Sequence, residues 1–365
     1  MKIYFTFKKP KNIKFLLLDD LSEELIDYLN LSKEESLVIK YNKRPIYLNI
    51  FFFFIIFKNF FKFLFSKKPT KVRFISLVYY LSLINYLTPK YIFNFLDNSL
   101  LFSNVDLNLN QKNFITIQNG FRCELNFLNN VLFFSNICFF SHLDKKKYLK
   151  YNCKINNSFI LGPIRALYYK DQNKVINESD YQYDICLVSQ YPGIYNFNEE
   201  NFIKKKVEYT ISKMNNFLIR LKNEENKKIT ILMRGNSQDE KNFYKNYGFD
   251  DSDLIERNLK NQWQTYDVMN KSELTLGFTT SCVQEAWSMG KKGIICDLTN
   301  TKLFNSFDLN LTIRDEEYLI FSKKINYFIS ISLEEFKNKF AEEISMYSVD
   351  FRKKTLEMLR NKIHA

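Results

Sequence analysis

Residues 273–298 read ELTLGFTTSCVQEAWSMGKKGIICDL, and they indicate the fold class more clearly than any other stretch. An apolar run over 273–278 is followed by hydroxyl residues, by a short helical pattern over 283–289, and by a second apolar run over 293–298. Short apolar runs that alternate with helical patterns are typical of the parallel sheets of α/β proteins. The stretch therefore predicts a β-α-β unit of Rossmann-like type.

The same alternation extends over most of the chain. In the second half the expected strands are 183–190 and 228–234, and the expected helices are 199–222, 239–247 and 263–271. In the first half the expected strands are 13–18, 37–41, 91–96, 114–118, 131–140 and 159–162, and the expected helices are 46–65 and 72–86. We therefore expect two Rossmann-like domains with a cleft between them.

The domain limits follow from the polar stretch 168–184, which we interpret as a linker. The prediction is an N-terminal domain over 1–170, a second domain over 171–330 and C-terminal helices over 331–365. Ser332 and Glu335 form a capping-box pattern at the start of these helices.

Composition excludes several classes of protein. The 365 residues are 46% hydrophobic and 25% charged, which suits packed cores and excludes general disorder. Six cysteines without CxxC spacing exclude a disulfide scaffold, and Cys186 and Cys296 lie in apolar runs as core residues do. Two histidines are too few for a histidine-rich zinc site or a histidine-based triad. The sequence opens without a secretory pattern, so we expect a cytoplasmic protein.

The positive charge is confined to the first half. Residues 1–170 hold 25 Lys and Arg against 11 Asp and Glu, which gives +14, whereas the remaining residues hold 28 against 29, which gives −1. The segment 36–96 carries ten basic residues and no acidic one, and it includes the apolar run 46–65. Lys58 and Lys62 interrupt that run, which argues against a membrane-spanning helix.

Two interpretations of the segment 36–96 stay open. It is either a buried helix with a lysine-bearing edge, or a basic and aromatic surface that contacts the anionic cytoplasmic face of a membrane. Nucleic acid is not an expected partner, because the sequence has no recognition helix, RNP-like strand or zinc module.

Polar residues follow the strand 273–278, at the edge of a parallel sheet where ligands bind. Thr279, Thr280 and Ser281 precede a helix, and Ser281 with Gln284 fits a capping box. A helix N-terminus suits a phosphate, and Glu285 in the first turn suits the hydroxyls of a ribose. The alternative is ordinary capping, with Glu285 as a solvated helix charge.

Other strand ends carry further candidates. Arg234 follows the run 228–234 and can hold a pyrophosphate or carboxylate through two hydrogen bonds, although an exposed arginine is equally common there. Asp97 and Asn98 follow the run 91–96, and an aspartate at such an edge suits a base or nucleophile. Ordinary turn formation is the alternative for both.

Several motifs together resemble one group of proteins. They are LDN at 96–98, TIQNGFR at 116–122, SHLDKKKY at 141–148, LGPIRA at 161–166 and GFTTSCVQEAWSMGKKGIICD at 277–297. From Pro89 to Leu298 the chain resembles the surface-carbohydrate biosynthesis proteins of bacterial polysaccharide loci, which look like GT-B glycosyltransferases and are similar to the transferases that use CMP-activated Kdo. Where relatives have a glycine-serine loop, this sequence has Gly-Phe-Thr-Thr-Ser at 277–281.

The resemblance implies a role for each candidate. The donor side would comprise Glu285 on the ribose, Thr279, Thr280 and Ser281 on the phosphate, and Gly277 and Arg234 beside them. Asp97 would be the catalytic carboxylate. The acceptor side and the cleft would comprise Asn98, Gln118, Asn119, Gly120, Arg122 and Arg165. GT-B chemistry requires neither a metal nor a cofactor, because helix N-termini and basic side chains can stabilise a departing phosphate.

These expectations combine into a cytoplasmic, membrane-associated glycosyltransferase. It would move a sugar, with a CMP-activated acidic sugar as one candidate, from a nucleotide-sugar donor to a surface polysaccharide or lipid-linked glycan. The alternatives are a nucleotide-sugar epimerase or a glycerophosphate-type transferase on the same scaffold, and a non-catalytic binding protein of a polysaccharide locus.

Overall fold

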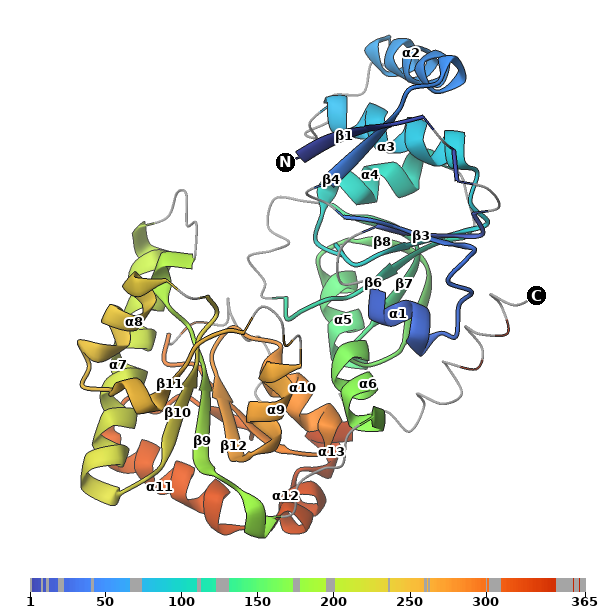
Figure 1. Cartoon of the computed structure of the whole chain (residues 1–365). Coiled ribbons are helices and arrows are strands. Elements are labelled where there is room, and N and C mark those ends of the chain that lie inside the picture. Colours follow the sequence, from blue (N-terminus) through green and yellow to red (C-terminus); the bar gives the residue numbers. More distant parts are fainter. Residues whose placement is uncertain are drawn as a thin grey trace. The chain divides into compact units, whose positions relative to one another are not determined.

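The computed structural model describes residues 2–7, 9–10, 13–18, 23–40, 43–65, 74–109, 113–122, 131–172, 178–194, 201–235, 237–258, 261, 263–299, 301, 310–345, 357 and 361. These residues form two compact units (Figure 1). Unit 1 contains the described residues of Met1–Asn119, Asn126–Ile164 and Val349–Ala365, and unit 2 contains those of Gly120–Leu125 and Arg165–Ser348. The division after Ile164 lies close to the domain limit predicted at 170.

Unit 1 is built on a six-stranded parallel sheet in the order β3-β2-β5-β6-β7-β8. The strands are β2 (Phe15–Leu18), β3 (Ser36–Ile39), β5 (Tyr91–Asn94), β6 (Phe114–Ile117), β7 (Phe133–Phe139) and β8 (Lys154–Ile160). Every residue of β2, β5 and β6 is buried. Interior strands of a parallel sheet are covered on both faces, which explains why they read as continuous apolar runs.

The helices of unit 1 are α1 (Glu23–Tyr28), α2 (Ile50–Leu64), α3 (Phe74–Leu87), α4 (Leu100–Leu109), α5 (His142–Lys150) and the start of α6 (Ile164–Gln172). A separate two-stranded parallel ladder pairs β1 (Lys2–Thr6) with β4 (Lys43–Tyr47). The core of the unit joins β2, β5 and β6 to α3 and α4, and Phe52 of α2 belongs to it.

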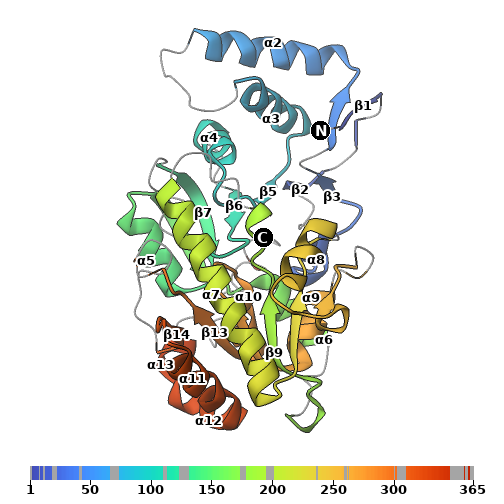
Figure 2. The ribbon, with the colours of Figure 1, turned by 90° about the vertical axis from the view of Figure 1, so that its left-hand side faces the viewer.

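The sequence predicted a single helix over 46–65, and this prediction is wrong. The run is divided between β4 and α2, because Asn49 has an extended backbone and its side chain accepts a hydrogen bond from the amide of Phe51 at 2.8 Å, which starts the helix there. Figure 2 shows α2 lying over α3. In the part of the chain that the structure describes, no helix is both long and apolar enough to cross a membrane.

Unit 2 is built on a second six-stranded parallel sheet, in the order β11-β10-β9-β12-β13-β14. The strands are β9 (Tyr183–Val188), β10 (Ile229–Leu232), β11 (Leu254–Ile255), β12 (Ser272–Gly277), β13 (Lys292–Cys296) and β14 (Thr312–Ile313). The predicted β-α-β unit is present, because β12 pairs with β13 in parallel. Cys186 and Cys296 are core residues, as expected.

The helices of unit 2 are the remainder of α6, α7 (Asn201–Glu225), α8 (Gln238–Lys245), α9 (Gln264–Asn270), α10 (Cys282–Met289), α11 (Tyr318–Ser330), α12 (Leu333–Lys339) and α13 (Ala341–Ser345). Three short 3₁₀ turns are η3 (Glu178–Asp180), η4 (Pro192–Ile194) and η5 (Asp251–Asp253). In Figure 1, α7 and α8 lie on one side of the sheet and α9 and α10 on the other.

One boundary prediction is wrong and one is confirmed. The linker expected over 168–184 begins inside a helix, because α6 continues to Gln172 and its Tyr169 is buried against Tyr266. Ser332 caps α12 as predicted, since its side chain accepts a hydrogen bond from the amide of Glu335 at 3.0 Å.

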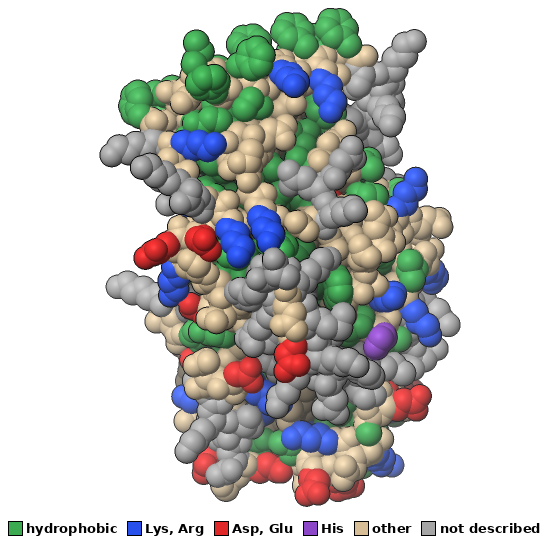
Figure 3. Space-filling view, turned by 90° about the vertical axis from the view of Figure 1, so that its right-hand side faces the viewer, with side chains coloured by type: hydrophobic (Ala, Val, Ile, Leu, Met, Phe, Trp, Pro, Cys, Tyr) green, Lys and Arg blue, Asp and Glu red, His purple; other side chains and the backbone are tan. Residues whose placement is uncertain are grey.

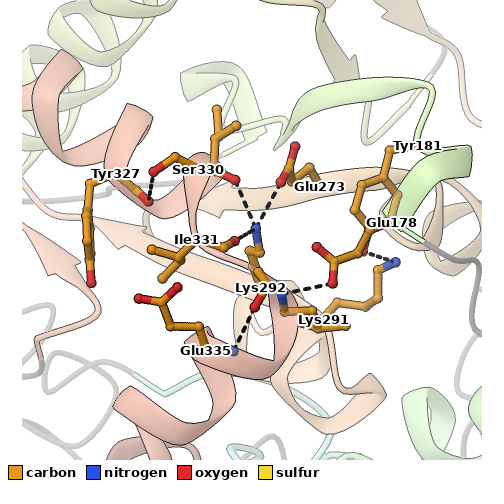
Figure 4. A network of polar contacts seen from close by, with 12 residues as sticks. Glu178, Tyr181, Glu273, Lys291, Lys292, Tyr327, Ser330, Ile331 and Glu335 are labelled. Atoms are coloured by element: carbon orange, nitrogen blue, oxygen red, sulfur yellow. Dashed lines mark hydrogen bonds and ion pairs between the residues drawn. The ribbon is translucent and has the colours of Figure 1, made fainter.

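The C-terminal helices are joined to unit 2 by a buried lysine (Figure 4). The ammonium of Lys292, at the start of β13, donates to Glu273 at 2.9 Å and to the carbonyl oxygens of Ile329 and Ile331 at 3.1 and 2.5 Å. Glu273 lies near the start of β12, so the network occupies the amino edge of the sheet. Lys291 and Lys292, the two lysines of the Gly-Lys-Lys motif at 290–292, therefore have a structural role at this edge of the sheet. Ligands bind at the opposite edge, outside the carboxyl ends of the strands.

The predicted fold class is confirmed: the protein is α/β, with two Rossmann-like units and helices near its C-terminus. The cleft between the two domains stays a prediction, and the predicted C-terminal helices beyond residue 345 fall almost entirely outside the described residues.

Candidate functional site

The carboxyl ends of the unit 2 strands bring several predicted residues to one edge. Arg234 follows β10, and Thr279, Thr280 and Ser281 follow β12. Because all strands of the sheet are parallel, the loops after β9, β10, β12 and β13 share this edge. The edge is therefore the candidate site of unit 2.

The loop before α10 is held by a residue that the sequence did not reveal. The side-chain oxygen of Gln190, in the loop after β9, accepts hydrogen bonds from the amide and the hydroxyl of Thr279 at 3.2 and 3.1 Å. The Gln190 side chain is fully buried, and its nitrogen donates to the carbonyl oxygens of Val188 and Ser189. The loop after β12 is thus connected to the loop after β9.

The start of α10 differs from the predicted capping box. Ser281 occupies the cap position with a helical backbone and makes no capping hydrogen bond, so the Ser281–Gln284 box is wrong. Thr280 replaces it, because its hydroxyl accepts a hydrogen bond from the amide of Cys282 at 3.2 Å. Among the described residues, the amides of Val283 and Gln284 have no hydrogen-bond acceptor. The helix therefore begins with donors available to an anion.

Gly277 has a steric reason to be glycine. A Cβ atom at this position would collide with the Thr280 methyl group and would lie 3.3 Å from Val283 Cγ2. The close approach lets Thr280 fold back over the end of β12, where its hydroxyl meets the start of α10.

Glu285 is buried in the first turn of α10, with 8% of its surface exposed. Burial raises the pKa of its carboxyl group, and hydrogen bonding to Ser281 and Tyr266 and the charge of Arg165 act in the opposite direction. The alternative of a solvated helix charge is therefore wrong. A buried carboxylate with a perturbed pKa and a cationic neighbour is typical of functional sites.

Arg165 belongs to the surroundings of Glu285 within unit 2, although the resemblance placed it on the acceptor side or in the cleft. Its guanidinium carbon lies 5.7 Å from the ring centroid of Trp263, which stacks on Tyr168 at 5.5 Å. The aromatic rings restrict the guanidinium, so that its charge stays beside the Glu285 carboxylate.

In the loop after β10, the backbone of Arg234 is hydrogen-bonded to the buried carboxylate of Glu240. Glu240, which is 1% exposed, accepts hydrogen bonds from the amides of Arg234 and Gly235 at 3.0 and 3.1 Å and from the Ser189 hydroxyl. These two amides are thus occupied, and the Arg234 side chain itself is half-buried. Burial, the largest cause, raises the pKa of the Cys282 thiol, and the charge of Arg234 acts in the opposite direction, so Arg234 lies near the start of α10.

In unit 1, Asp97 follows β5 and is fully buried. One of its oxygens accepts a hydrogen bond from the amide of Asn119 at 3.1 Å, and the other accepts one from the Tyr148 hydroxyl. Gln118 is also buried, and its side-chain oxygen accepts a hydrogen bond from the amide of Phe140 at 2.9 Å. Both side chains therefore connect neighbouring strand ends. The catalytic role of Asp97 stays a prediction.

A second buried carboxylate lies beside Asp97. Asp144, near the start of α5, accepts a hydrogen bond from the Ser141 hydroxyl at 2.6 Å. Burial raises the pKa of Asp144, the charge of Lys147 lowers it, and the charge of Asp97 raises it further. We use the name buried polar cluster for Asp97, Gln118, Asp144, Lys147 and Tyr148.

The remaining predicted residues are divided between the units. Asn98 is exposed and Asn119 half-buried in unit 1. Gly120 and Arg122 are buried and belong to unit 2, where an Arg122 nitrogen donates to the carbonyl oxygen of Phe121 at 3.1 Å. The structure therefore places Gly120, Arg122, Arg165, Arg234, Gly277, Thr279, Thr280, Ser281 and Glu285 in unit 2, and Asp97, Asn98, Gln118 and Asn119 in unit 1.

Sequence reasoning missed three groups of residues at these edges. They are Gln190 and Glu240 in unit 2, Asp144, Lys147 and Tyr148 in unit 1, and the pair formed by Asp297 and Arg314 after β13 and β14, whose side chains approach to 3.3 Å. A signal was present for the second group, because residues 144, 147 and 148 share one face of a helix.

Two Rossmann-like units with parallel sheets define an α/β protein of the GT-B type. The sequence matches no protein-family profile and no curated protein. Among solved structures, a putative UDP-N-acetylglucosamine 2-epimerase from Listeria monocytogenes is 10% identical, with a TM-score of 0.53 over 100% of this chain and 94% of that one.

Two further structures are similar. UDP-GlcNAc 2-epimerase from Neisseria meningitidis, bound to UDP-GlcNAc, is 11% identical with a TM-score of 0.51 over 100% of both chains. MnaA from S. aureus, in a co-structure with UDP, is 12% identical with a TM-score of 0.50 over 97% of this chain and 94% of that one. At these identities the likeness shows the shared fold alone.

Proposed function

We propose that the protein is a glycosyltransferase that moves a sugar from a nucleotide-sugar donor to a surface polysaccharide or lipid-linked glycan. The observation that supports it best is Glu285, a buried carboxylate beside Arg165 in the first turn of α10. The same turn begins with the amides of Val283 and Gln284, which have no acceptor in the described part of the protein. Carboxylate and amides together suit a nucleoside phosphate.

In this proposal the nucleotide lies at the carboxyl edge of the unit 2 sheet. Glu285 accepts hydrogen bonds from the ribose hydroxyls, and the start of α10 binds the phosphate. Arg234 approaches the same helix end and supplies positive charge to the departing phosphate. Thr279, Thr280 and Ser281 shape the loop and contribute hydroxyl groups. These residues stabilise the leaving group without a metal ion.

The acceptor is assigned to unit 1. The segment 36–96, with ten basic residues and no acidic one, supports peripheral contact with an anionic membrane on its cytoplasmic side. Both carboxylate oxygens of Asp97 accept hydrogen bonds within unit 1, one from the Asn119 amide and the other from the Tyr148 hydroxyl. We therefore assign it the role of a positioning residue, which holds Asn119 and, through the strand ends, the exposed Asn98 toward the acceptor.

A nucleotide-sugar 2-epimerase is the second candidate. It is favoured by one observation: two of the similar structures, with TM-scores of 0.51 and 0.53, are described as UDP-GlcNAc 2-epimerases, and the third, MnaA, is a co-structure with UDP. The same donor site would serve it, and no acceptor would be needed.

Nucleotide binding is the first test. Isothermal calorimetry is carried out with UDP, CMP and GDP on the full chain, on Glu285→Gln, and on the control Glu334→Gln, which changes an exposed glutamate of α12. We expect one nucleotide to bind and Glu285→Gln to weaken it about tenfold or more, because hydrogen bonds to a charged group are lost. Equal affinity in Glu285→Gln would remove this residue from the site.

Product analysis separates the candidate activities. The protein is incubated in D₂O with UDP-, GDP- and CMP-activated sugars and activated glycerol phosphate, with and without a membrane extract as acceptor. A transferase releases the nucleotide only with acceptor. A 2-epimerase must break the C2–H bond, so it exchanges deuterium there without release. Nucleotide binding with neither reaction would leave the non-catalytic binding protein.

A further inference from the structure

The outer face of α2 is apolar and open to solvent. Its most exposed apolar side chains, with their exposed fractions, are Ile50 (80%), Phe51 (70%), Phe54 (67%), Phe57 (60%), Leu64 (53%), Phe61 (48%) and the C-cap residue Phe65 (77%). Figure 3 shows hydrophobic side chains gathered at the end of unit 1 that carries this helix, with Lys and Arg side chains beside them. An apolar face of this kind on a folded protein marks an interaction surface.

The exposure is fixed by the packing of the opposite face. Phe52 and Asn59 are buried, and they are seven residues apart, which places them two turns apart on one side of the helix. The Asn59 side-chain nitrogen donates to the Ser82 hydroxyl of α3 at 2.9 Å, within the core. Rotation of α2 to hide its phenylalanines would break this buried hydrogen bond, so the apolar face stays outward.

Two lysines border the apolar face. Lys58 and Lys62 are exposed and one turn apart, and at 100° per residue both lie on the flank that also carries Phe51. Among the described residues neither lysine forms an ion pair with a carboxylate, and the whole segment 36–96 contains no acidic residue. The surface therefore combines aromatic rings with uncompensated positive charge.

The dimensions of α2 suit a bilayer surface and not its interior. Its 15 residues span about 22 Å, whereas the hydrocarbon core is about 30 Å thick. An amphipathic helix with aromatic residues on one side and lysines at its border lies in the plane of the interface, where the rings enter the acyl region and the lysines reach the phosphates.

We propose that α2 docks unit 1 onto an anionic lipid bilayer by inserting Phe54, Phe57 and Phe61, with Lys58 and Lys62 on the lipid phosphates. A second copy of the chain fits less well, because pairing two such faces would bring like-charged lysines together with no acidic residue of this segment to compensate them. This inference rests on the proposed function, in which the segment 36–96 contacts an anionic membrane. It assigns that contact to α2.

The test measures vesicle binding separately from sugar chemistry. The full chain and its variants are sedimented with vesicles of phosphatidylcholine alone or of phosphatidylcholine mixed with anionic phosphatidylglycerol. We expect Phe57→Ser/Phe61→Ser to lose about tenfold or more in binding to anionic vesicles. Lys58→Gln/Lys62→Gln should lose about tenfold on anionic vesicles and show little change on neutral ones.

The matched control is Leu319→Ser/Ile320→Ser, which removes two exposed apolar side chains from α11 of unit 2 and should bind vesicles like the unchanged protein. Circular dichroism confirms that each variant is folded. Absence of vesicle binding by the unchanged protein overturns the proposal, as does a dimer that the Phe57→Ser/Phe61→Ser variant converts to a monomer. Vesicle binding without any nucleotide binding would support α2 docking and contradict the proposed function.

Discussion

Gln190 and Thr279 are 89 positions apart in the chain, and the Gln190 side-chain oxygen accepts hydrogen bonds from both the amide and the hydroxyl of Thr279. They follow β9 and β12, which are neighbours in the unit 2 sheet. The contact determines where the loop before α10 lies, and therefore where the candidate phosphate donors at Val283 and Gln284 point. A buried amide side chain without charge thus positions the candidate site.

Gln190→Ala should weaken nucleotide binding by about threefold to tenfold and lower the free energy of unfolding by about 1–3 kcal/mol, because buried donors lose their acceptor. Calorimetry and urea unfolding measure the two effects. Thr279→Val is the matched variant, since it removes the hydroxyl contact and keeps the amide contact, and its effects should be smaller. Unchanged affinity in Gln190→Ala would show that the loop holds its position without this contact.

Asp97→Asn should reduce sugar transfer strongly and leave nucleotide binding unchanged. The variant keeps an oxygen for the Asn119 amide but places an amide nitrogen near the Tyr148 hydroxyl, so the strand ends of unit 1 shift while unit 2 is not altered. Full transfer activity in Asp97→Asn would exclude the residue from the mechanism.

Tyr148→Phe distinguishes positioning from chemistry. It leaves the Asp97 carboxyl group in place and removes one of its donors, which should cost about 1–3 kcal/mol of unfolding free energy because the carboxylate is fully buried. If Asp97 is a positioning residue, transfer should also fall, with the effect on kcat larger than on nucleotide affinity. Tyr151→Phe, which alters a half-buried tyrosine at the end of the same helix, is the control.

Glu240→Gln should destabilise unit 2 by about 1–3 kcal/mol. The Glu240 carboxylate accepts hydrogen bonds from two amides and one hydroxyl, and a glutamine would turn an amide nitrogen toward one of these donors. Urea unfolding measures the change. Asp239→Asn removes the same charge from the same helix turn but at an exposed position, and it should leave the unfolding midpoint nearly unchanged. Equal midpoints for the two variants would contradict the role of Glu240.

Much of the fold could be predicted because the interior strands are buried on both faces. The runs around β5, β6, β9 and β12 are apolar for that reason, and each was located within a few residues. The two-residue strands β11 and β14 have no such run and were missed. The division between β4 and α2 was hidden as well, since apolar residues continue across it and only Asn49 marks the boundary.

The candidate site could be predicted only where a residue lies just after a strand or in the first turn of the helix that follows the strand. Glu285 and Arg234 were found in this way. Gln190 and Tyr148 were not, because their partners Thr279 and Asp97 lie 89 and 51 positions away, which no local pattern contains. Glu240 was missed as well, since only the fold shows that its carboxylate is buried and accepts hydrogen bonds from the amides of Arg234 and Gly235 and from the Ser189 hydroxyl. The burial of Asp97 could not be predicted either. An aspartate after a strand gives the same sequence pattern whether its oxygens contact solvent or a tyrosine hydroxyl.

Lys291 makes the stability of unit 2 depend on pH. Its side chain is buried beside Lys292 (Figure 4), where its ammonium donates to the Tyr181 hydroxyl at 3.0 Å and to the carbonyl oxygen of Asn270 at 2.8 Å. Burial, the largest cause, lowers the pKa of Lys291 to about 8, and the charge of Lys337 acts in the same direction. In the unfolded chain a lysine has a pKa of about 10.4.

Between about pH 8 and pH 10 the unfolded state therefore binds more protons at Lys291 than the folded state does, and the folded state gains stability as the pH rises. The quantity to measure is the unfolding free energy of the unchanged protein minus that of Lys291→Met, since other titrating groups largely cancel in this difference. It should increase by about 1 kcal/mol per pH unit near pH 9. Between pH 6 and 7 both states hold the proton, so the difference should be flat there and serves as the internal control. A difference that stays flat up to pH 10 would mean that the pKa of Lys291 is not lowered by folding. The two hydrogen bonds of its ammonium group would then fully compensate for its burial.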